Sequence, residues 1–300
     1  MRRRIEVVEV GPRDGLQNES VLMSTADKVS LIRRAIGAGA RRIEVASFVN
    51  PKRVPQMADA EAVVELLGAP KGVTRIGLVL NERGAERALA SGLDQLGAVA
   101  IASDSFGIRN QGQDSAQSIE VAKRIITLAR GAELTAQVTI AVAFGCPFEG
   151  EVAEQRVVEM AIALAEAGPV EIGLADTIGV GNPAHVASLV GKVRLAVPTV
   201  PVRVHFHNTR GTGLANVWSA ILAGAVTVDA AIGGLGGCPF APGAAGNVST
   251  EDVVYMLERA GVRSGLDLSQ LVSANHWLCE VMQRPLPGMV AKAPPFPKQS

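Results

Sequence analysis

The chain has few aromatic residues, no excess of either charge and no long apolar run. Phe, Trp and Tyr make up 3% of its 300 residues, and 29 basic residues balance 29 acidic ones. Nucleic-acid binding needs concentrated positive charge and usually aromatic side chains that stack on bases, so we expect no nucleic-acid partner. No apolar stretch approaches the length that crosses a bilayer, so we expect no membrane association either.

Cysteine is also scarce. Cys146, Cys238 and Cys279 are odd in number and none is in a Cys-x-x-Cys pair, which argues against a disulfide framework. The arginines at residues 2–4 run straight into a predicted strand, without the apolar core of a secretory signal. Residues 298–300 are not a peroxisomal address. These features predict a cytoplasmic protein of the size of an enzyme.

What the sequence does contain is a repeated alternation of two kinds of segment. Short runs rich in β-branched residues alternate with longer amphipathic runs, and the pair occurs eight times. We expect strands over residues 5–10, 42–46, 75–80, 97–102, 136–143, 170–174, 202–208 and 227–232. We expect the helices that follow them over residues 25–39, 58–67, 82–91, 115–130, 151–167, 184–196, 213–223 and 250–259.

Eight successive strand–helix units predict a (β/α)8 TIM barrel, an α/β fold with a parallel sheet. No Gly-x-Gly-x-x-Gly follows a strand, so an open dinucleotide-binding sheet has no support. Residues 267–283 are predicted to form one extra C-terminal helix, and no linker divides the chain. We therefore expect a single barrel domain over residues 1–284, including this helix, and a proline-rich tail over residues 285–300.

Two histidines stand at the end of the seventh predicted strand, in the sequence His205-Phe206-His207. In a TIM barrel, catalytic residues lie at the C-terminal ends of the strands and in the loops that follow. Alternate side chains of a strand share a face, so both imidazoles point the same way. A single histidine there would usually be a core residue. A pair that precedes polar Asn208 indicates a metal site, with core packing as the competing interpretation.

Oxygen ligands for such a site occur at the ends of two other strands. Asp14 follows the first strand, and Asn247 ends the loop after the eighth. With His205 and His207 they form a set of two nitrogens and two oxygens without a thiolate. That set suits Mg²⁺ or Mn²⁺ better than a structural zinc. Asn247 has an alternative role as a helix cap.

Further polar residues are predicted to lie at the same mouth. Arg13 cannot lose its charge and can hold a carbonyl or enolate oxygen. Glu44, within the second strand, is costly to bury unless it is paired, and Arg13 is its expected partner. Gln17 lies in the first loop and Ser47 at the end of the second strand. Both are candidate substrate-binding residues, although turn formation explains Ser47 equally well.

Asp176 and Cys238 follow the sixth and eighth strands. Asp176 could cap the next helix, but Asn182 is better placed for that, so we expect Asp176 to orient the substrate. Cys238 lies in a glycine-rich loop without the Gly-Lys-[Ser/Thr] ending of a phosphate-binding loop. We interpret this loop as a mobile lid that carries one reactive side chain.

These residues belong to stretches in which the chain resembles the 3-hydroxy-3-methylglutaryl-CoA lyase family of metal-dependent TIM-barrel lyases. The matching stretches are residues 8–19 (VEVGPRDGLQNE), 46–51 (ASFVNP), 54–57 (VPQM), 176–181 (DTIGVG), 234–246 (GLGGCPFAPGAAG) and 250–257 (TEDVVYML). They span nearly the whole chain in the expected order. Related condensing synthases share the Arg-Asp-Gly and His-x-His elements but not the Gly-Leu-Gly-Gly-Cys-Pro loop.

The resemblance implies a role for each candidate residue. It implies metal ligation by Asp14, His205, His207 and Asn247, enolate stabilisation by Arg13, proton transfer by Cys238, active-site carboxylates at Glu44 and Asp176, and proximity of Ser47 to the substrate's carboxylate. The family's reaction cleaves 3-hydroxy-3-methylglutaryl-CoA to acetyl-CoA and acetoacetate. The expected partner is a small-molecule acyl-CoA, and a homodimer or a higher homo-oligomer is compatible with the sequence.

The sequence leaves the identity of the substrate's acyl group open. Ser20, Gln137, Thr139, Asn208, Arg210 and Phe240 depart from the family's pattern and are candidates for lining the pocket. Citramalyl-CoA or a longer branched 3-hydroxyglutaryl-CoA is therefore an alternative substrate. A condensing synthase is an alternative enzyme, and a non-catalytic barrel that binds acyl-CoA or a partner protein is an alternative of another class.

Overall fold

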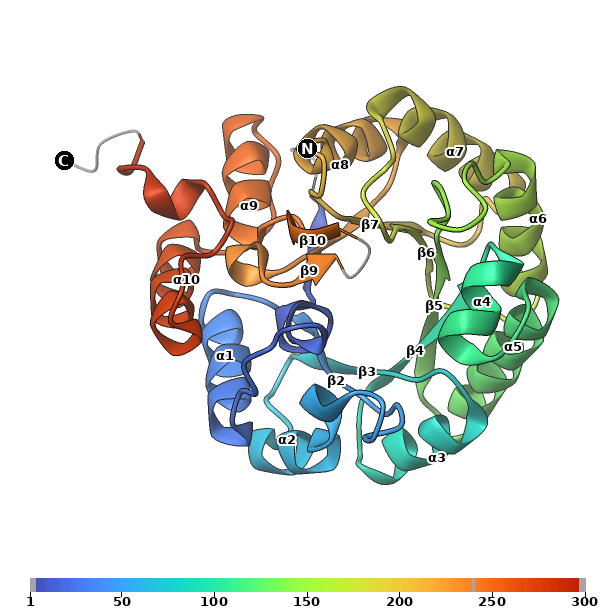
Figure 1. The fold of residues 1–300 in the computed structure, drawn as a ribbon, viewed down its shortest axis with the longest axis horizontal. Coiled ribbons are helices and arrows are strands. Elements are labelled where there is room, and N and C mark those ends of the chain that lie inside the picture. Colours follow the sequence, from blue (N-terminus) through green and yellow to red (C-terminus); the bar gives the residue numbers. More distant parts are fainter. Residues whose placement is uncertain (1–3, 239–240, 297–300) are drawn as a thin grey trace.

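Eight parallel strands form a closed barrel at the centre of the molecule (Figure 1). The computed structural model describes residues 4–238 and 241–296, without the side chains of residues 238 and 241–244. The strands are β1 (Glu6–Glu9), β2 (Arg42–Ser47), β3 (Thr74–Leu78), β4 (Gln95–Ile101), β5 (Thr135–Ala141), β6 (Ile172–Asp176), β7 (Val202–Phe206) and β8 (Thr227–Ala230). Pairing of β1 with β8 along their whole lengths closes the sheet. The predicted (β/α)8 barrel is confirmed.

Helices on the outside of the barrel cover the strands. They are α1 (Thr25–Gly37), α2 (Ala60–Leu67), α3 (Glu82–Ala90), α5 (Ser115–Gly131), α6 (Glu154–Ala165), α7 (Pro183–Ala196), α8 (Gly213–Ala223) and α9 (Thr250–Arg259). The expected extra helix is α10 (Leu268–Met282), which lies outside this ring beside α1 and α9 (Figure 1). Within the described residues, none of the helices combines the length and the apolarity that spanning a membrane requires.

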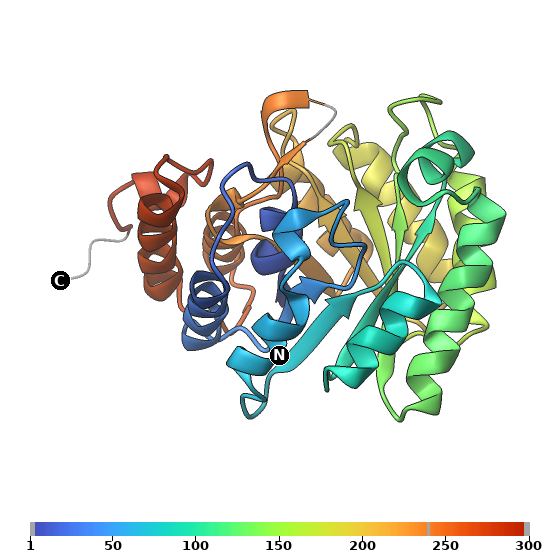
Figure 2. The same ribbon diagram turned by 60° about the horizontal axis from the view of Figure 1, so that its bottom comes forward.

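Two features on the rim were not predicted. Helix α4 (Asp104–Gln111) lies between β4 and α5, in a segment for which we expected no helix. Only Phe106 and Gly107 of this helix are buried, so it lacks the apolar periodicity that identifies a helix. Strands β9 (Gly237–Cys238) and β10 (Ala241–Ala245) form an antiparallel pair within the loop after β8. Figure 2 shows this orange loop rising from the same rim as the green α4.

The interior of the barrel contains charged side chains as well as apolar ones. Arg42 on β2 lies 2.7 Å from Glu6 and 2.8 Å from Glu171, nitrogen to oxygen. Arg203 on β7 lies 3.7 Å from Glu171 and 2.5 Å from Asp229 on β8. A series of ion pairs therefore crosses the barrel from the N-terminal end of β1 towards β8. Each charge has a partner of opposite sign, which offsets part of the cost of its burial.

The segment after α10, residues 284–292, lies against the start of the loop that follows β8. Leu286 is buried, and a Cβ at Gly233 would lie 2.4 Å from its side chain. The backbone N–H of Gly288 donates to the Gly233 carbonyl oxygen over 2.8 Å, and that of Met289 donates to the Asp252 carboxylate. Gly233 has a φ of +73°, so both its conformation and its lack of space favour glycine.

Candidate metal centre and active site

Arg13 and Asp14 lie in one turn of π-helix, η1 (Gly11–Gly15), which follows β1. The Val10 carbonyl oxygen accepts hydrogen bonds from the backbone N–H groups of Arg13, Asp14 and Gly15. Turns of this kind are rare and occur frequently at functional sites. This turn carries both side chains to the mouth of the barrel, at the C-terminal end of the strands.

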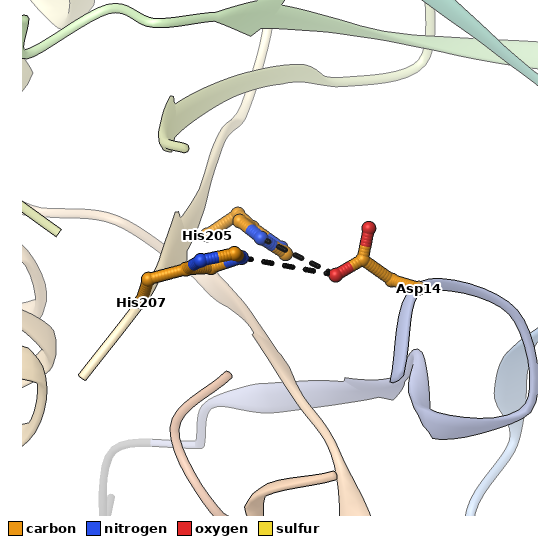
Figure 3. Close-up of side chains that lie close together, drawn as sticks. All are labelled: Asp14, His205 and His207. Atoms are coloured by element: carbon orange, nitrogen blue, oxygen red, sulfur yellow. Dashed lines mark ion pairs between the residues drawn. The ribbon is translucent and has the colours of Figure 1, made fainter. Parts of the chain in front are cut away.

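His205 and His207 face Asp14 across this mouth (Figure 3). Nε2 of each histidine lies 3.8 Å from Oδ2 of Asp14, and the three candidate ligand atoms all lie within 4.8 Å of one another. Two ligands bound about 2.1 Å from one ion are separated by roughly 3 to 3.5 Å. A shift of less than about an ångström would therefore bring all three groups to a common cation, so the predicted cluster fits a divalent metal.

Asp14 carries the charge that a metal ligand needs. Burial by itself would raise the pKa of Asp14. Arg13, whose Nη1 lies 2.8 Å from Oδ1 of Asp14, and the two histidines outweigh burial and hold this pKa well below its ordinary value. Asp14 is therefore ionised at neutral pH, as metal binding requires.

Asn247 lies beside this cluster. A β-bridge joins its backbone to that of His207, and its Nδ2 donates hydrogen bonds to Oδ2 of Asp14 over 2.9 Å and to the Leu235 carbonyl oxygen over 3.1 Å. Cap formation, the alternative for Asn247, is carried out by the neighbouring Ser249, which accepts from Asp252 at the start of α9. Ligation of a metal by the amide oxygen of Asn247 stays a prediction.

Arg13 is held by the carboxylate that the sequence indicated. Nε and Nη2 of Arg13 both lie 2.7 Å from Oε2 of Glu44, and Nη1 lies 3.4 Å from Oε1 of Gln17. Burial raises the pKa of Glu44, and Arg13 opposes this shift. The pair fixes the plane of the guanidinium group beside Asp14, and Gln17 is part of the same network.

Ser47 ends β2, after an irregularity in the pairing of β2 with β3. The register shifts by one residue between Glu44 and Ala46. Strict alternation of faces along residues 44–47 is therefore interrupted, because an extra residue in one strand changes which face the following side chains occupy. Oγ of Ser47 is buried and has no hydrogen-bond partner among the described residues. Contact of Ser47 with a substrate stays a prediction.

Asp176 is the last residue of β6, and its carboxylate organises the loop that follows. Its two oxygens accept hydrogen bonds from the backbone N–H groups of Val180 and Gly181, each over 2.9 Å. Burial raises the pKa of Asp176, against these hydrogen bonds and the two histidines. Asn182 caps α7, as expected, by accepting from Ala184 and His185. The role of Asp176 in orienting the substrate stays a prediction.

The backbone of Cys238 forms part of β9 and pairs with Ala241 of β10. Its side chain, and residues 239 and 240, lie outside what the structure describes. The start of this loop is attached to the first loop by Glu9, whose Oε1 accepts from Gly11 over 2.9 Å and from Ile232 over 3.0 Å. The roots of the two loops that carry Asp14 and Cys238 are therefore joined.

Asp229 on β8 lies beside the candidate metal centre, and the sequence interpretation missed it. Its Oδ2 lies 3.3 Å from Nδ1 of His205 and 2.5 Å from Nη1 of Arg203. Burial raises the pKa of Asp229, but Arg203 and His205 outweigh it and lower the pKa below its ordinary value. The sequence does contain a signal for this contact. Arg203 and Asp229 lie in two consecutive predicted strands, and opposite charges there are costly to bury unless they pair with each other.

Of the residues that depart from the family pattern, Ser20 is exposed, Phe240 lies outside the described residues, and four others contact other parts of the protein. Gln137 accepts from Arg42 and Thr139 from Arg203, both inside the barrel. Asn208 accepts from the backbone N–H of Gly213, and Arg210 donates to the carbonyl oxygens of Ile178 and Gly179. Asn208 and Arg210 therefore hold the loop after β7 to its surroundings. Contacts within the protein therefore explain the polar side chains at these four positions without a bound substrate.

The closed barrel and the cluster at its C-terminal mouth define a TIM-barrel enzyme whose candidate active site draws on the loops after β1, β7 and β8. The family model described as HMGL-like matches residues 4–278. The chain belongs to this family, and the expected resemblance and lyase class are confirmed.

Individual relatives cover nearly all of the chain. It is 40% identical over 285 residues to the hydroxymethylglutaryl-CoA lyase YngG of Bacillus subtilis, covering 95% of each chain. It is 42% identical over 301 residues to the (R)-citramalyl-CoA lyase of Chloroflexus aurantiacus, covering 97% of this chain and 95% of the other. A solved HMG-CoA lyase from Acinetobacter baumannii, in complex with coenzyme A and 3-methylmalate, superposes with a TM-score of 0.93 at 38% identity, covering 99% and 97% of the two chains.

Proposed function

We propose that the protein is a divalent-metal-dependent carbon–carbon lyase. Its proposed substrate is 3-hydroxy-3-methylglutaryl-CoA or a close 3-hydroxyacyl-CoA, and its products are acetyl-CoA and a keto acid such as acetoacetate. The observation that carries the proposal is the position of Asp14, which faces both histidines through one oxygen and Arg13 through the other. A cation site and a fixed positive charge are therefore adjacent, and relatives named as lyases of this kind share about 40% of the sequence.

The proposed reaction breaks the bond between the carbon that bears the hydroxyl group and the methylene carbon next to the thioester. Mg²⁺ or Mn²⁺, held by Asp14, His205, His207 and Asn247, would supply the acidity of that hydroxyl and orient the oxygens of the substrate. As the hydroxyl loses its proton, its carbon becomes the ketone of the leaving keto acid. The other fragment leaves as the enolate of acetyl-CoA and gains a proton at its methylene carbon.

The residues of the chain have distinct roles in this proposal. Arg13, oriented by Glu44, donates hydrogen bonds to the thioester oxygen on which negative charge develops. Asp176, or a water molecule linked to a histidine, accepts the hydroxyl proton, and Cys238 delivers a proton to the enolate carbon. Ser47 and Gln17 contact the substrate. For Ser47 the support is its buried hydroxyl group, which has no hydrogen-bond partner among the residues that the structure describes.

Citramalyl-CoA is a second candidate substrate, because a relative with 42% identity is named an (R)-citramalyl-CoA lyase. This thioester lacks one methylene group between the hydroxyl-bearing carbon and the carboxylate, and its cleavage gives pyruvate in place of acetoacetate. One methylene group is worth about 1–3 kcal/mol in discrimination. Both substrates, and a longer branched 3-hydroxyglutaryl-CoA, should therefore be compared side by side.

The test measures acetyl-CoA release from these three thioesters by purified protein with Mg²⁺ or Mn²⁺. We expect turnover of at least one thioester, its loss with a chelator, and its recovery when metal is restored. His207→Ala should abolish both Mn²⁺ binding and turnover. His276→Ala is the matched control, since His276 is exposed on α10 and its Nε2 lies 3.1 Å from the Ala291 carbonyl oxygen, away from the cluster.

Absence of turnover with all three thioesters would contradict the proposal. If the protein instead releases free thiol from acetyl-CoA and a keto acid faster than it cleaves any thioester, it is a condensing synthase. Binding of acyl-CoA without either reaction would identify a non-catalytic barrel.

A further inference from the structure

We propose that Asp229 is a positioning residue for the metal centre. It holds His205 with a proton on Nδ1, so that the lone pair of Nε2 is directed at the cation site beside Asp14. This inference deepens the proposed function and rests on it, because it presupposes that His205 binds a metal.

The two nitrogens of His205 face two different carboxylates. Nδ1 lies 3.3 Å from Oδ2 of Asp229, and Nε2 lies 3.8 Å from Oδ2 of Asp14. A neutral imidazole carries its proton on one nitrogen and a lone pair on the other. A cation beside Asp14 needs the lone pair on Nε2, so the proton must be on Nδ1, and Asp229 is the acceptor located there.

Asp229 is fixed by contacts on its other side. Nη1 of Arg203 lies 2.5 Å from the same Oδ2, and Nη2 of Arg203 donates to Oγ1 of Thr139 over 2.5 Å. Asp229 is 3% exposed, and its Oδ1 is buried without a hydrogen-bond partner among the described residues. The carboxylate therefore has little freedom to turn away from His205.

Further ion pairs in the barrel hold Arg203 in place. Nε of Arg203 lies 3.7 Å from Oε2 of Glu171, and the same oxygen lies 2.8 Å from Nη2 of Arg42. Glu171 therefore reaches His205 only through Arg203 and Asp229, whereas Asp229 contacts the imidazole directly. Replacing a group that orients a metal-binding histidine typically lowers metal affinity about 10- to 100-fold.

The first test compares Asp229→Asn with Glu171→Gln. Both substitutions replace a buried carboxylate beside Arg203 by its amide, but only Asp229 contacts His205. Calorimetric titration with Mn²⁺ at neutral pH should show a loss of affinity of about 10- to 100-fold for Asp229→Asn. Glu171→Gln should bind Mn²⁺ with nearly the affinity of the unchanged protein. Circular dichroism establishes that each variant is folded.

Two results of this titration overturn the inference. In one, Asp229→Asn binds Mn²⁺ as tightly as the unchanged protein does. In the other, both variants lose affinity equally, which indicates a general effect of charge instead of a contact with His205. Failure of the unchanged protein to bind Mn²⁺ is a different result, because it contradicts the proposed function itself.

A second measurement needs no folded variant of Asp229. The chain has 4 histidines, so the ring-nitrogen NMR signals of His205 can be assigned in uniformly labelled protein with the help of substitutions at the other three. In the Mg²⁺-loaded protein we expect the ring proton of His205 on Nδ1, with a coupling through the hydrogen bond to the carboxylate group of Asp229. We expect no proton on Nε2. A proton on Nε2 and none on Nδ1 would show that Asp229 does not have this role.

Discussion

Arg13 and Glu44 are joined through two nitrogens and one oxygen. Nε and Nη2 of Arg13 each lie 2.7 Å from Oε2 of Glu44, which leaves Nη1 directed towards Asp14 and Gln17. Because this contact uses the planar fork of the guanidinium group, an ammonium group cannot reproduce it. The direction of the positive charge at the mouth is therefore set by a carboxylate on β2.

Arg13→Lys should lower kcat by about 10²- to 10³-fold while leaving Mn²⁺ binding nearly unchanged. Lysine keeps the charge next to Asp14 but cannot be oriented by Glu44 and still reach the substrate oxygen. Steady-state kinetics and metal titration on the same preparation measure the two effects. Arg210→Lys is the control, because Arg210 contacts only loop carbonyl oxygens among the described residues. Equal kcat values for Arg13→Lys and the unchanged protein would rule out the assigned role.

Asn247→Asp should make thermal stability more dependent on metal. The substitution replaces the Nδ2 that donates to Asp14 over 2.9 Å by an oxygen, so that two carboxylates face each other. Their repulsion lowers Tm without metal, and a cation relieves it, so the rise in Tm on adding Mn²⁺ should exceed that of the unchanged protein. Asn182→Asp, where a carboxylate can still cap α7, is the control for the same change in charge. An identical rise in Tm for both variants and the unchanged protein would contradict this prediction.

Glu9→Gln should reduce the pH dependence of stability between about pH 5 and pH 8. Burial raises the pKa of Glu9 to about 7 from an ordinary value of 4.5, although hydrogen bonds from Thr250, Ile232 and Gly11 favour its charged form. The folded protein therefore keeps a proton that the unfolded chain has lost. This contribution is complete below the unfolded pKa and is lost as the pH rises through about 7, and it amounts to about 3 kcal/mol.

Glutamine can accept from the same two N–H groups and donate to Thr250, so it imitates the protonated acid at every pH. Free energies of unfolding from urea titrations at several pH values measure the effect. Glu65→Gln, on the exposed side of α2, is the control for the loss of one carboxylate. If both variants show the pH dependence of the unchanged protein, Glu9 does not retain this proton.

Leu286→Ala should lower the free energy of unfolding by about 2–5 kcal/mol. Leu286 is 2% exposed and its side chain fills the space over Gly233 at the root of the loop after β8, so the substitution leaves a cavity. Leu195→Ala, at a side chain that is 84% exposed, should change stability by no more than about 0.5 kcal/mol. Equal stability of the two variants would show that residues 284–292 do not contribute to the folded barrel.

The sequence was sufficient to predict the barrel and the grouping of Asp14, His205 and His207 at its mouth. The spacing of His205 and His207 depends only on strand geometry, and the rule that places barrel chemistry at strand ends brought Asp14 to the same mouth. The pairing of Arg13 with Glu44 followed from the cost of burying one carboxylate alone. Each of these inferences uses local geometry together with one general property of the fold.

Contacts that depend on register across the barrel could not be predicted. Arg203 reaches Thr139 on β5 and Asp229 on β8, and which side chains meet there depends on the stagger of strands that are separated in sequence. The irregularity in β2 next to Glu44 changes the faces of the following residues, and no turn or glycine signal marks it. Asn208 hydrogen-bonds to Gly213 within its own loop and Arg210 to carbonyl oxygens of the loop after β6, and contact of either side chain with a substrate stays a prediction.

The pairing of β1 with β8, which closes the barrel, has a consequence for folding. Asp14 follows β1, whereas His207 and Asn247 follow β7 and β8, so these groups meet only after the two ends of the barrel have paired. Contacts between such distant segments carry a high loop-closure entropy and form slowly. A cation bound there adds its binding free energy to the closed barrel and none to an open intermediate. Metal binding would then report the completion of folding and protect the barrel against opening at the place where it closes.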